Sequence, residues 1–187
     1  MTNFSLYSVL ACIVLDSSGK RIFAKYYDHP HQPGQNPYSS ETKQVEFETG
    51  LAKKTHKDPT EVILYDGNLA TFKECGDAVI YLIGPADENE LLLHSLVTSI
   101  REALEMILGS SINKRTLLEN YDILALTIDE FIDAGVVMQP DSTIVAGRVS
   151  RAPSQEASRQ IDLSEQGILN YMSIARERIS ETLRQSL

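Results

Sequence analysis

The chain has 187 residues, of which 17 are Lys or Arg and 26 are Asp or Glu, so its formal net charge at pH 7 is −9. This length is typical of one domain and allows a buried core without disulfides or metal. The acidic balance argues against nucleic acid or an anionic membrane as the main partner, because both bind a basic face, and 42% apolar residues argue against a chain that is disordered throughout.

The first half of the chain has the pattern of short strands interrupted by one helix. Turn residues at 16–19 (DSSG) join the first two strands into a predicted hairpin, and Asp66-Gly67, the pair preferred in a type I′ turn, joins the next two. Consecutive hairpins of this kind imply antiparallel pairing. The strands are predicted over residues 8–15, 21–27, 61–65, 69–73 and 78–83, and the helix over 41–54.

The second half has the pattern of helices. The first and last predicted strands are apolar at successive positions, whereas a half-solvated sheet would alternate, so we expect helices on both faces of the sheet. Asp87 is the expected N-cap of a helix that stops at Gly109, and a second helix over 114–134 is expected to bend near Asn120. A short extended piece over 136–139 and a short helix over 141–149 follow. The predicted fold class is α+β.

The composition changes near the C-terminus. Residues 1–147 form the predicted body, residues 148–163 are polar and are typical of a linker, and residues 164–187 have the pattern of an amphipathic helix. The apolar side of this tail is expected to dock either on the body or on a partner, and the pattern does not favour one over the other. The expected docking residues are Ile168, Met172 and Ile179.

Few residues of the chain suggest catalysis or metal binding. The pair His29 and His31 lacks further ligands nearby in the sequence, and Asp129 with Asp133 forms a single i, i+4 pair on a predicted helix without a second carboxylate helix or a histidine. Cys12 and Cys75 are expected to be reduced thiols. The sequence therefore predicts no catalytic residue, no cofactor and no metal site, and it favours a protein that binds other proteins, with a hydrolase of unrecognised site as the rival from another class.

Two other histidines have ordinary structural interpretations. His94 lies within a leucine-rich helical stretch and is expected to be a partly buried, hydrogen-bonded histidine. His56 belongs to the run KKTHK at 53–57, which is typical of a solvated helix end, with contact to a phosphate or a lipid headgroup as the alternative.

Several segments of the sequence resemble the zeta-subunit family of coatomer, the COPI vesicle coat, and more broadly the small subunits of adaptor complexes. Together these segments extend over most of the predicted body. The resembling segments are residues 19–28 (GKRIFAKYYD), 54–57, 81–84, 88–91, 114–120, 128–137 and 163–166.

This resemblance implies a longin-like fold, a five-stranded antiparallel sheet flanked by helices on both faces. It implies a non-enzymatic structural subunit that pairs with the coatomer gamma subunit and assembles with the other coatomer subunits. It also implies peripheral localisation on the cytosolic side of Golgi membranes and COPI-coated vesicles, with an Arf-type GTPase engaged indirectly, in Golgi-to-ER and intra-Golgi transport. The alternatives are a clathrin-adaptor small subunit and another longin-type trafficking or tethering factor.

Candidate contact residues follow from residue type and from the resemblance. Tyr27, Phe47, Leu51 and Tyr121 are the expected contacts with gamma, because aromatic and leucine anchors often carry interface energy; the alternative is that they belong to the core. The resemblance places a dileucine-cargo pocket position of adaptor small subunits at Glu102, where a carboxylate matches leucine side chains poorly.

Overall fold

The computed structural model describes residues 6–28, 37–56, 60–109 and 111–150, and the structural statements that follow refer to these residues. The chain divides into two units, Met1–Ser150 and Arg151–Leu187. The second unit, which includes the predicted tail with Ile168, Met172 and Ile179, lies outside the described residues, as do His29 and His31. Within the described part of the chain, no helix combines the length and the apolar character that crossing a membrane requires.

A five-stranded antiparallel sheet forms the centre of the first unit, as predicted, with the strand order β2-β1-β5-β4-β3. All six residues of β1 are buried, because this strand has a neighbour on each side and helices over both faces. Pairing of β1 with β5 was not evident from the sequence. The strands are β1 (Ala11–Asp16), β2 (Arg21–Tyr26), β3 (Val62–Tyr65), β4 (Asn68–Cys75) and β5 (Ala78–Pro85).

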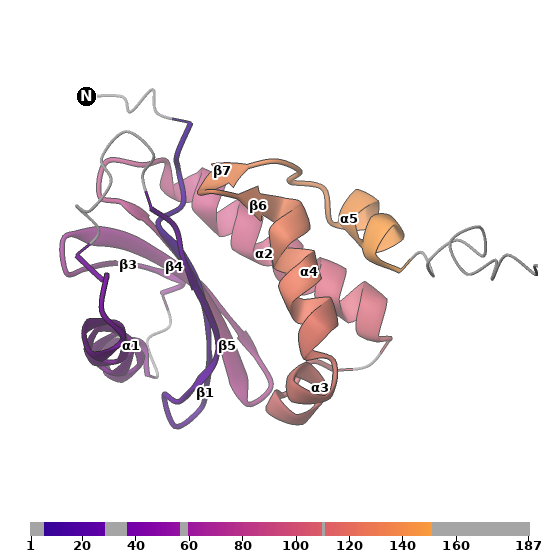
Figure 1. Cartoon of the computed structure of the whole chain (residues 1–187), viewed down its shortest axis with the longest axis horizontal. Helices are drawn as coiled ribbons and strands as arrows, with labels where there is room; N and C mark the ends of the chain where they lie inside the picture. Colours follow the sequence, from indigo (N-terminus) through magenta and orange to yellow (C-terminus); the bar gives the residue numbers. More distant parts are fainter. Residues whose placement is uncertain (1–5, 29–36, 57–59, 110, 151–187) are drawn as a thin grey trace, which may run out of the picture. The chain divides into compact units, whose positions relative to one another are not determined.

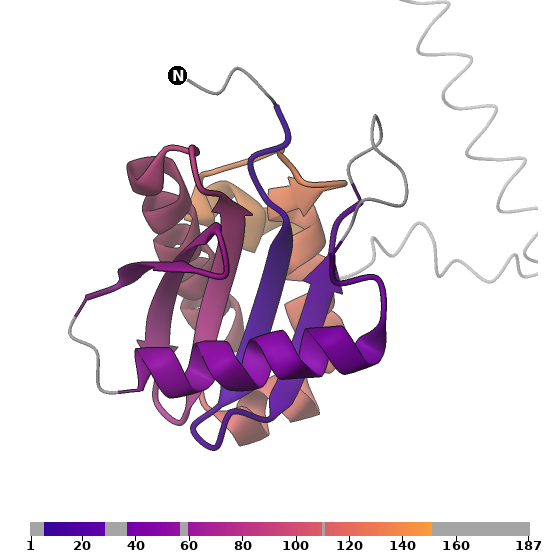
Figure 2. The ribbon, with the colours of Figure 1, turned by 90° about the vertical axis from the view of Figure 1, so that its left-hand side faces the viewer.

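Helices cover both faces of the sheet, which confirms the expectation from the continuously apolar strands. Helix α1 crosses one face, and α2 and α4 lie on the other (Figures 1 and 2). The long helical stretch breaks at Asn120, as predicted. The helices are α1 (Glu41–Thr55), α2 (Glu90–Leu108), α3 (Lys114–Glu119), α4 (Tyr121–Phe131) and α5 (Ser142–Val149). Helix α5 continues two residues beyond the predicted end of the body at 147.

Helix α2 starts two residues later than the sequence suggested. The predicted N-cap Asp87 is wrong: Asn89 is the N-cap, and its side-chain oxygen accepts hydrogen bonds from the backbone nitrogens of Leu91 (3.0 Å) and Leu92 (3.3 Å). Both residue types are good caps, so the apolar pattern alone did not distinguish them. The predicted stop at Gly109 is correct, with φ of 59°.

A small hairpin replaces the expected end of the helix over 114–134. Helix α4 stops at Phe131, and β6 (Ile132–Asp133) pairs with β7 (Val136–Val137). The turn residues Ala134 and Gly135 both have positive φ, 48° and 84°. Alanine rarely adopts this conformation, so Ala134 is not a turn signal, whereas the extended piece predicted over 136–139 agrees with β7.

The sheet separates two hydrophobic clusters. The cluster on the α1 side includes Ile13, Phe47 and Leu51, and the larger one on the α2 side includes Val14, Leu82 and most of the apolar stripe of α2. Each cluster holds its own helical layer against the sheet, because burial of apolar side chains is the main favourable term in folding.

Candidate partner-binding surfaces

Burial determines which of the expected contact residues lie at the surface. Tyr27, Phe47 and Leu51 are 7%, 4% and 0% exposed, so their side chains belong to the core of the free chain and are not presented to a partner. The sequence pattern did not separate anchors for a partner from anchors for the sheet, because both are aromatic or leucine residues. Tyr121 is 47% exposed, with its ring 5.9 Å from that of Phe23, and it remains a proposed contact.

The carboxylates considered for metal binding do not form one site. Asp129 on α4 makes an ion pair of 2.6 Å with Lys25 of β2, whereas Asp133 belongs to β6. The predicted i, i+4 pair on one helix face is therefore wrong, because the helix ends before Asp133. Across the described ranges, no three His, Cys, Asp or Glu side chains are grouped so that they could hold a metal ion.

His94 has the structural role that the sequence indicated. Its Nε2 lies 2.7 Å from Glu61 Oε2, and the same carboxylate binds Lys73 Nζ at 2.5 Å. These two contacts lower the pKa of Glu61, with Lys73 as the larger cause. The cluster connects α2 to β4 at the protein surface.

The lysine-rich end of α1 is a helix terminus, as expected. Lys53 and Lys54 lie in its last turn, where cations interact favourably with the helix dipole. Lys54 Nζ donates a hydrogen bond of 3.0 Å to the carbonyl of Leu64, so this end of α1 is fastened to β3.

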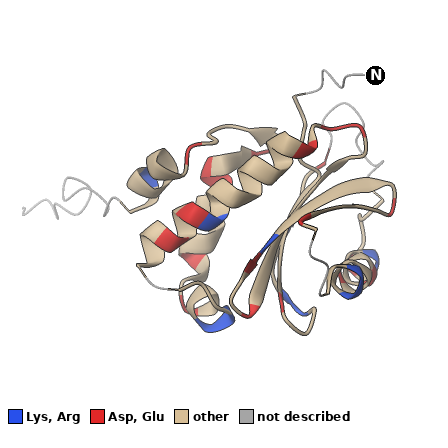
Figure 3. Cartoon of the chain, turned by 180° about the vertical axis from the view of Figure 1, so that it is seen from behind, with Lys and Arg blue, Asp and Glu red and all other residues tan. Residues whose placement is uncertain are grey.

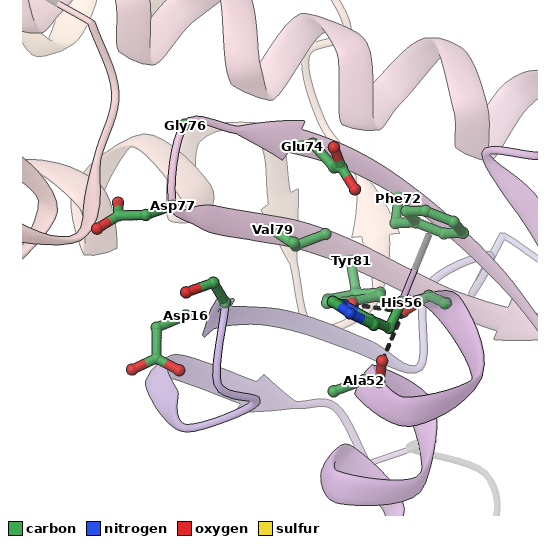
Figure 4. Close-up of a pocket in the computed structure, with 11 residues that line it drawn as sticks. Asp16, Ala52, His56, Phe72, Glu74, Gly76, Asp77, Val79 and Tyr81 are labelled. Carbon is green, nitrogen blue, oxygen red and sulfur yellow. Dashed lines mark hydrogen bonds between the residues drawn. The ribbon is translucent and has the colours of Figure 1, made fainter. Parts of the chain in front are cut away.

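A hollow lies between the end of α1 and the β4–β5 hairpin (Figure 4). Phe72, Val79 and Tyr81 line it from the sheet, and Glu74 and His56 stand at its edge. Its volume is about 160 Å³, below the roughly 300–1,000 Å³ of pockets that bind cofactors and drug-sized ligands.

Three of the polar side chains beside this hollow are engaged within the protein. Thr55 Oγ1 lies 2.8 Å from the hydroxyl of Tyr81, and Asp16 Oδ2 accepts from Lys114 Nζ at 2.7 Å. Asp77 Oδ1 accepts from the backbone nitrogen of Lys114 at 2.6 Å.

Glu102 lies on the outer side of α2. It is exposed, and its Oε2 accepts a hydrogen bond of 3.1 Å from Ser142 Oγ of α5. A carboxylate with this partner keeps the position polar, in line with the expected poor match to leucine side chains.

Apart from Tyr121, the exposed apolar side chains are a surface feature that the sequence did not reveal. Periodicity does not tell which apolar residues remain uncovered, since Val45, Leu92 and Leu118 fit the helical stripes and are nevertheless exposed. The exposed large apolar residues of the described chain are Leu6, Val45, Leu64, Leu91, Leu92, Met106, Leu118, Tyr121, Leu126, Met138 and Ile144.

The fold is that of the small subunits of adaptor complexes, as two comparisons with known proteins show. Residues 8–156 match the family described as Clathrin adaptor complex small chain, and the chain belongs to this family. A chain of a full-length AP-3 complex in a stretched open conformation, itself a homology model, has the same fold, with a TM-score of 0.61 and 13% identity over 80% of this chain and 96% of that chain.

Sequence relatives narrow the position within the family. The chain is 40% identical over 190 residues to coatomer subunit zeta of Saccharomyces cerevisiae, with all of both chains covered. It is 35% identical to human coatomer subunit zeta-1, covering 96% of this chain and 94% of that protein. It is 31% identical to coatomer subunit zeta-1 of rice, Oryza sativa subsp. japonica, covering 94% and 96%.

Proposed function

We propose that the chain is a non-enzymatic structural subunit of the COPI vesicle coat, corresponding to coatomer zeta. The observation that carries this proposal is the 40% identity to a coatomer zeta subunit over the full length of both chains. The rival adaptor small subunits share the fold, but the AP-3 chain shares only 13% of its residues with this chain. As a coat subunit, the protein acts in Golgi-to-ER and intra-Golgi transport.

Its direct partner is the coatomer gamma subunit, within a complex that includes the other coatomer subunits. The acidic charge of −9 and the exposed apolar residues support binding to a larger protein rather than independent action. The Arf-type GTPase is engaged indirectly, through gamma. The chain reaches the cytosolic side of Golgi membranes and coated vesicles as part of the complex.

Affinity purification from the source cells tests this proposal. A tagged copy of the chain recovers the gamma subunit in equimolar amount, together with the other coatomer subunits, as identified by mass spectrometry. Recovery of clathrin-adaptor or tethering subunits instead, or of the chain alone, contradicts it. A screen of esterase and phosphatase substrates tests the hydrolase alternative. Turnover of any substrate that is abolished by a single carboxylate substitution would support a hydrolase.

Residues 164–187 have the pattern of an amphipathic helix, whose apolar side needs a surface to cover it. We propose that Ile168, Met172 and Ile179 dock on a coat partner. Replacing all three by Asp should reduce recruitment of the chain to Golgi membranes while the body keeps its cooperative melting. Loss of that melting would assign the tail to the core of the body instead.

A further inference from the structure

The most exposed apolar side chains of the described chain lie at one end of the sheet. Leu91 is 76% exposed, Leu6 75%, and Leu64 and Met138 60% each, whereas the next, Leu118, is 51% exposed. We refer to Leu6, Leu64, Leu91 and Met138 as the strand-end surface. They come from four separate segments of the sequence.

The strand register places two of these segments together. Leu64 lies opposite Leu69, and Leu69 lies opposite Gly84 near the end of β5. Leu69 faces the α2 side, and partners opposite each other on antiparallel strands share a face, so Leu64 faces that side too. Helix α2, with Leu91 in its first turn, starts five residues after β5 ends.

Backbone contacts bring the other two segments to the same end. Tyr7 pairs with Val136 of β7, and Val9 donates to the carbonyl of Gly135 at 3.1 Å. Leu10 donates to the carbonyl of Ile83 at 2.7 Å, which fixes the N-terminal segment beside β5. Figures 1 and 2 show the N-terminal segment, β7 and the first turn of α2 at this end.

Close packing makes this arrangement rigid. A Cβ atom at Gly84 would lie 2.7 Å from the carbonyl oxygen of Ser8 and 2.6 Å from Leu93 Cδ1, and one at Gly135 would lie 2.6 Å from the carbonyl oxygen of Val9. The backbone segments thus meet without intervening side chains. A rigid surface loses little conformational entropy when a partner binds.

The segments that form the strand-end surface carry acidic but no basic residues, and a basic group beside them is Lys54 of α1, which donates to the carbonyl of Leu64. Residues 6–10, 62–69, 83–92 and 132–140 contain no Lys or Arg. Figure 3 shows acidic residues on α2 and the adjoining loops at this end. The acidic residues of these segments are Asp66, Asp87, Glu88, Glu90 and Asp133.

We infer that the strand-end surface binds an apolar segment of the gamma subunit that is flanked by lysine or arginine side chains. Apolar side chains at the centre exclude water, and the acidic rim selects a basic partner and speeds its association. Five strands at a spacing of about 4.8 Å give an end roughly 20 Å wide, which is wide enough for one helix of about 10 Å diameter. This inference rests on the proposed function, because it assigns the surface that meets the proposed partner.

Binding of purified gamma subunit to full-length variants tests the inference. Leu91→Ser with Met138→Ser should raise the dissociation constant about tenfold or more, as expected for apolar anchors at the centre of an interface. The matched control is Leu118→Ser with Leu126→Ser, at residues 51% and 50% exposed on α3 and α4, and it should change the dissociation constant less than about threefold. Thermal melting of both variants should equal that of the unaltered chain, because all four side chains are at the surface.

A second pair of variants tests the acidic rim. Asp87→Asn with Glu90→Gln should slow association and flatten its dependence on ionic strength. Asp122→Asn with Glu74→Gln removes the same charge from α4 and from the opposite end of β4, and should change the salt dependence less.

The outcomes separate the inference from the proposed function. If the unaltered chain binds gamma and the strand-end variants bind as tightly as it does, or no more weakly than their controls, the inference is overturned and the proposed function stands. If the unaltered chain does not bind gamma, the proposed function fails and the inference fails with it.

Discussion

Arg21 and Glu48 form a two-point ion pair that joins the edge strand β2 to helix α1. Arg21 Nε donates to Glu48 Oε2 at 2.8 Å, and a second guanidinium nitrogen lies 2.8 Å from Oε1. The hydroxyl of Tyr26 also donates to Oε1, at 2.9 Å. The Glu48 side chain is only 3% exposed, so its charge depends on these partners for compensation.

Removing the charge of Glu48 should destabilise the protein strongly for a single substitution. Glu48→Gln leaves Arg21 without a charged partner in a partly buried site, and the free energy of unfolding should fall by about 2 kcal/mol. Urea denaturation followed by circular dichroism measures this change. The double variant Arg21→Met, Glu48→Leu should lose less, because neither charge is left unpaired; a larger loss in the double variant would contradict this account.

Position 135 requires glycine both because its φ is positive and because a Cβ atom there would clash with a neighbouring segment. Comparison with Gly67, which has only the positive φ, separates the two effects. Gly135 and Gly67 have similar positive φ values, 84° and 74°, but a Cβ atom at Gly67 meets no atom within 4 Å, whereas one at Gly135 would crowd Val9. Gly67→Ala should cost about 1 kcal/mol of the free energy of unfolding, and Gly135→Ala more than about 2 kcal/mol. If urea denaturation shows the same loss of unfolding free energy for both variants, the segment at Val9 moves away from the added Cβ atom at no cost, which would contradict this prediction.

Acid should weaken the connection between the β1–β2 turn and α3. Burial alone would raise the pKa of Asp16, but hydrogen bonds from Lys114, Ser18 and the backbone of Lys20 outweigh it and hold this pKa well below its usual range. The ionised carboxylate therefore stabilises the fold above the ordinary pKa near 4, and this stabilisation is lost as the pH falls from there towards the lower folded value.

Asp16→Asn tests this assignment. The variant should be less stable than the unaltered chain at neutral pH, and its free energy of unfolding should fall less between about pH 5 and pH 2. Asp122→Asn, at an exposed site on α4, is the control and should keep the original pH dependence. An unchanged acid transition in Asp16→Asn would assign the pH dependence to other groups.

Both cysteines should be unreactive in the folded protein. Burial raises the pKa of Cys12 to about 12 and that of Cys75 to about 11, and both thiols are free and buried. Since the thiolate is the reactive form, alkylation by iodoacetamide at pH 8 should be slow and should become fast in urea. Mass spectrometry of the alkylated peptides distinguishes the two sites, and fast labelling of either without denaturant would contradict its burial.

The parts of the fold that the sequence predicted are those governed by local patterns. The turn at Asp66-Gly67, the break at Asn120 and the stop at Gly109 depend on a few neighbouring residues. The strands on either side of these turns follow from continuous apolar runs. The extended piece over 136–139 was predicted and contains β7, but the turn that joins it to β6 was not, because that turn places Ala134 at positive φ.

Features that depend on distant parts of the chain were not predictable. Glu48 has the pattern of a solvated helix residue, and its burial depends on Arg21, 27 residues earlier. Phe47 and Leu51 are residue types that often anchor interfaces, and only the tertiary structure shows that the sheet already covers them. The strand-end surface likewise consists of four separate segments of the sequence, so no local pattern predicts it.

The central position of β1 has a consequence for synthesis on the ribosome. β1 is the first strand to be made, and β2 follows within a few residues, but its other neighbour is β5, which ends at Pro85. The nascent hairpin must therefore expose one edge of its most apolar strand until residue 85 has left the exit tunnel. During that interval the unpaired edge can pair with other chains, so the nascent chain is more prone to aggregate than the folded protein.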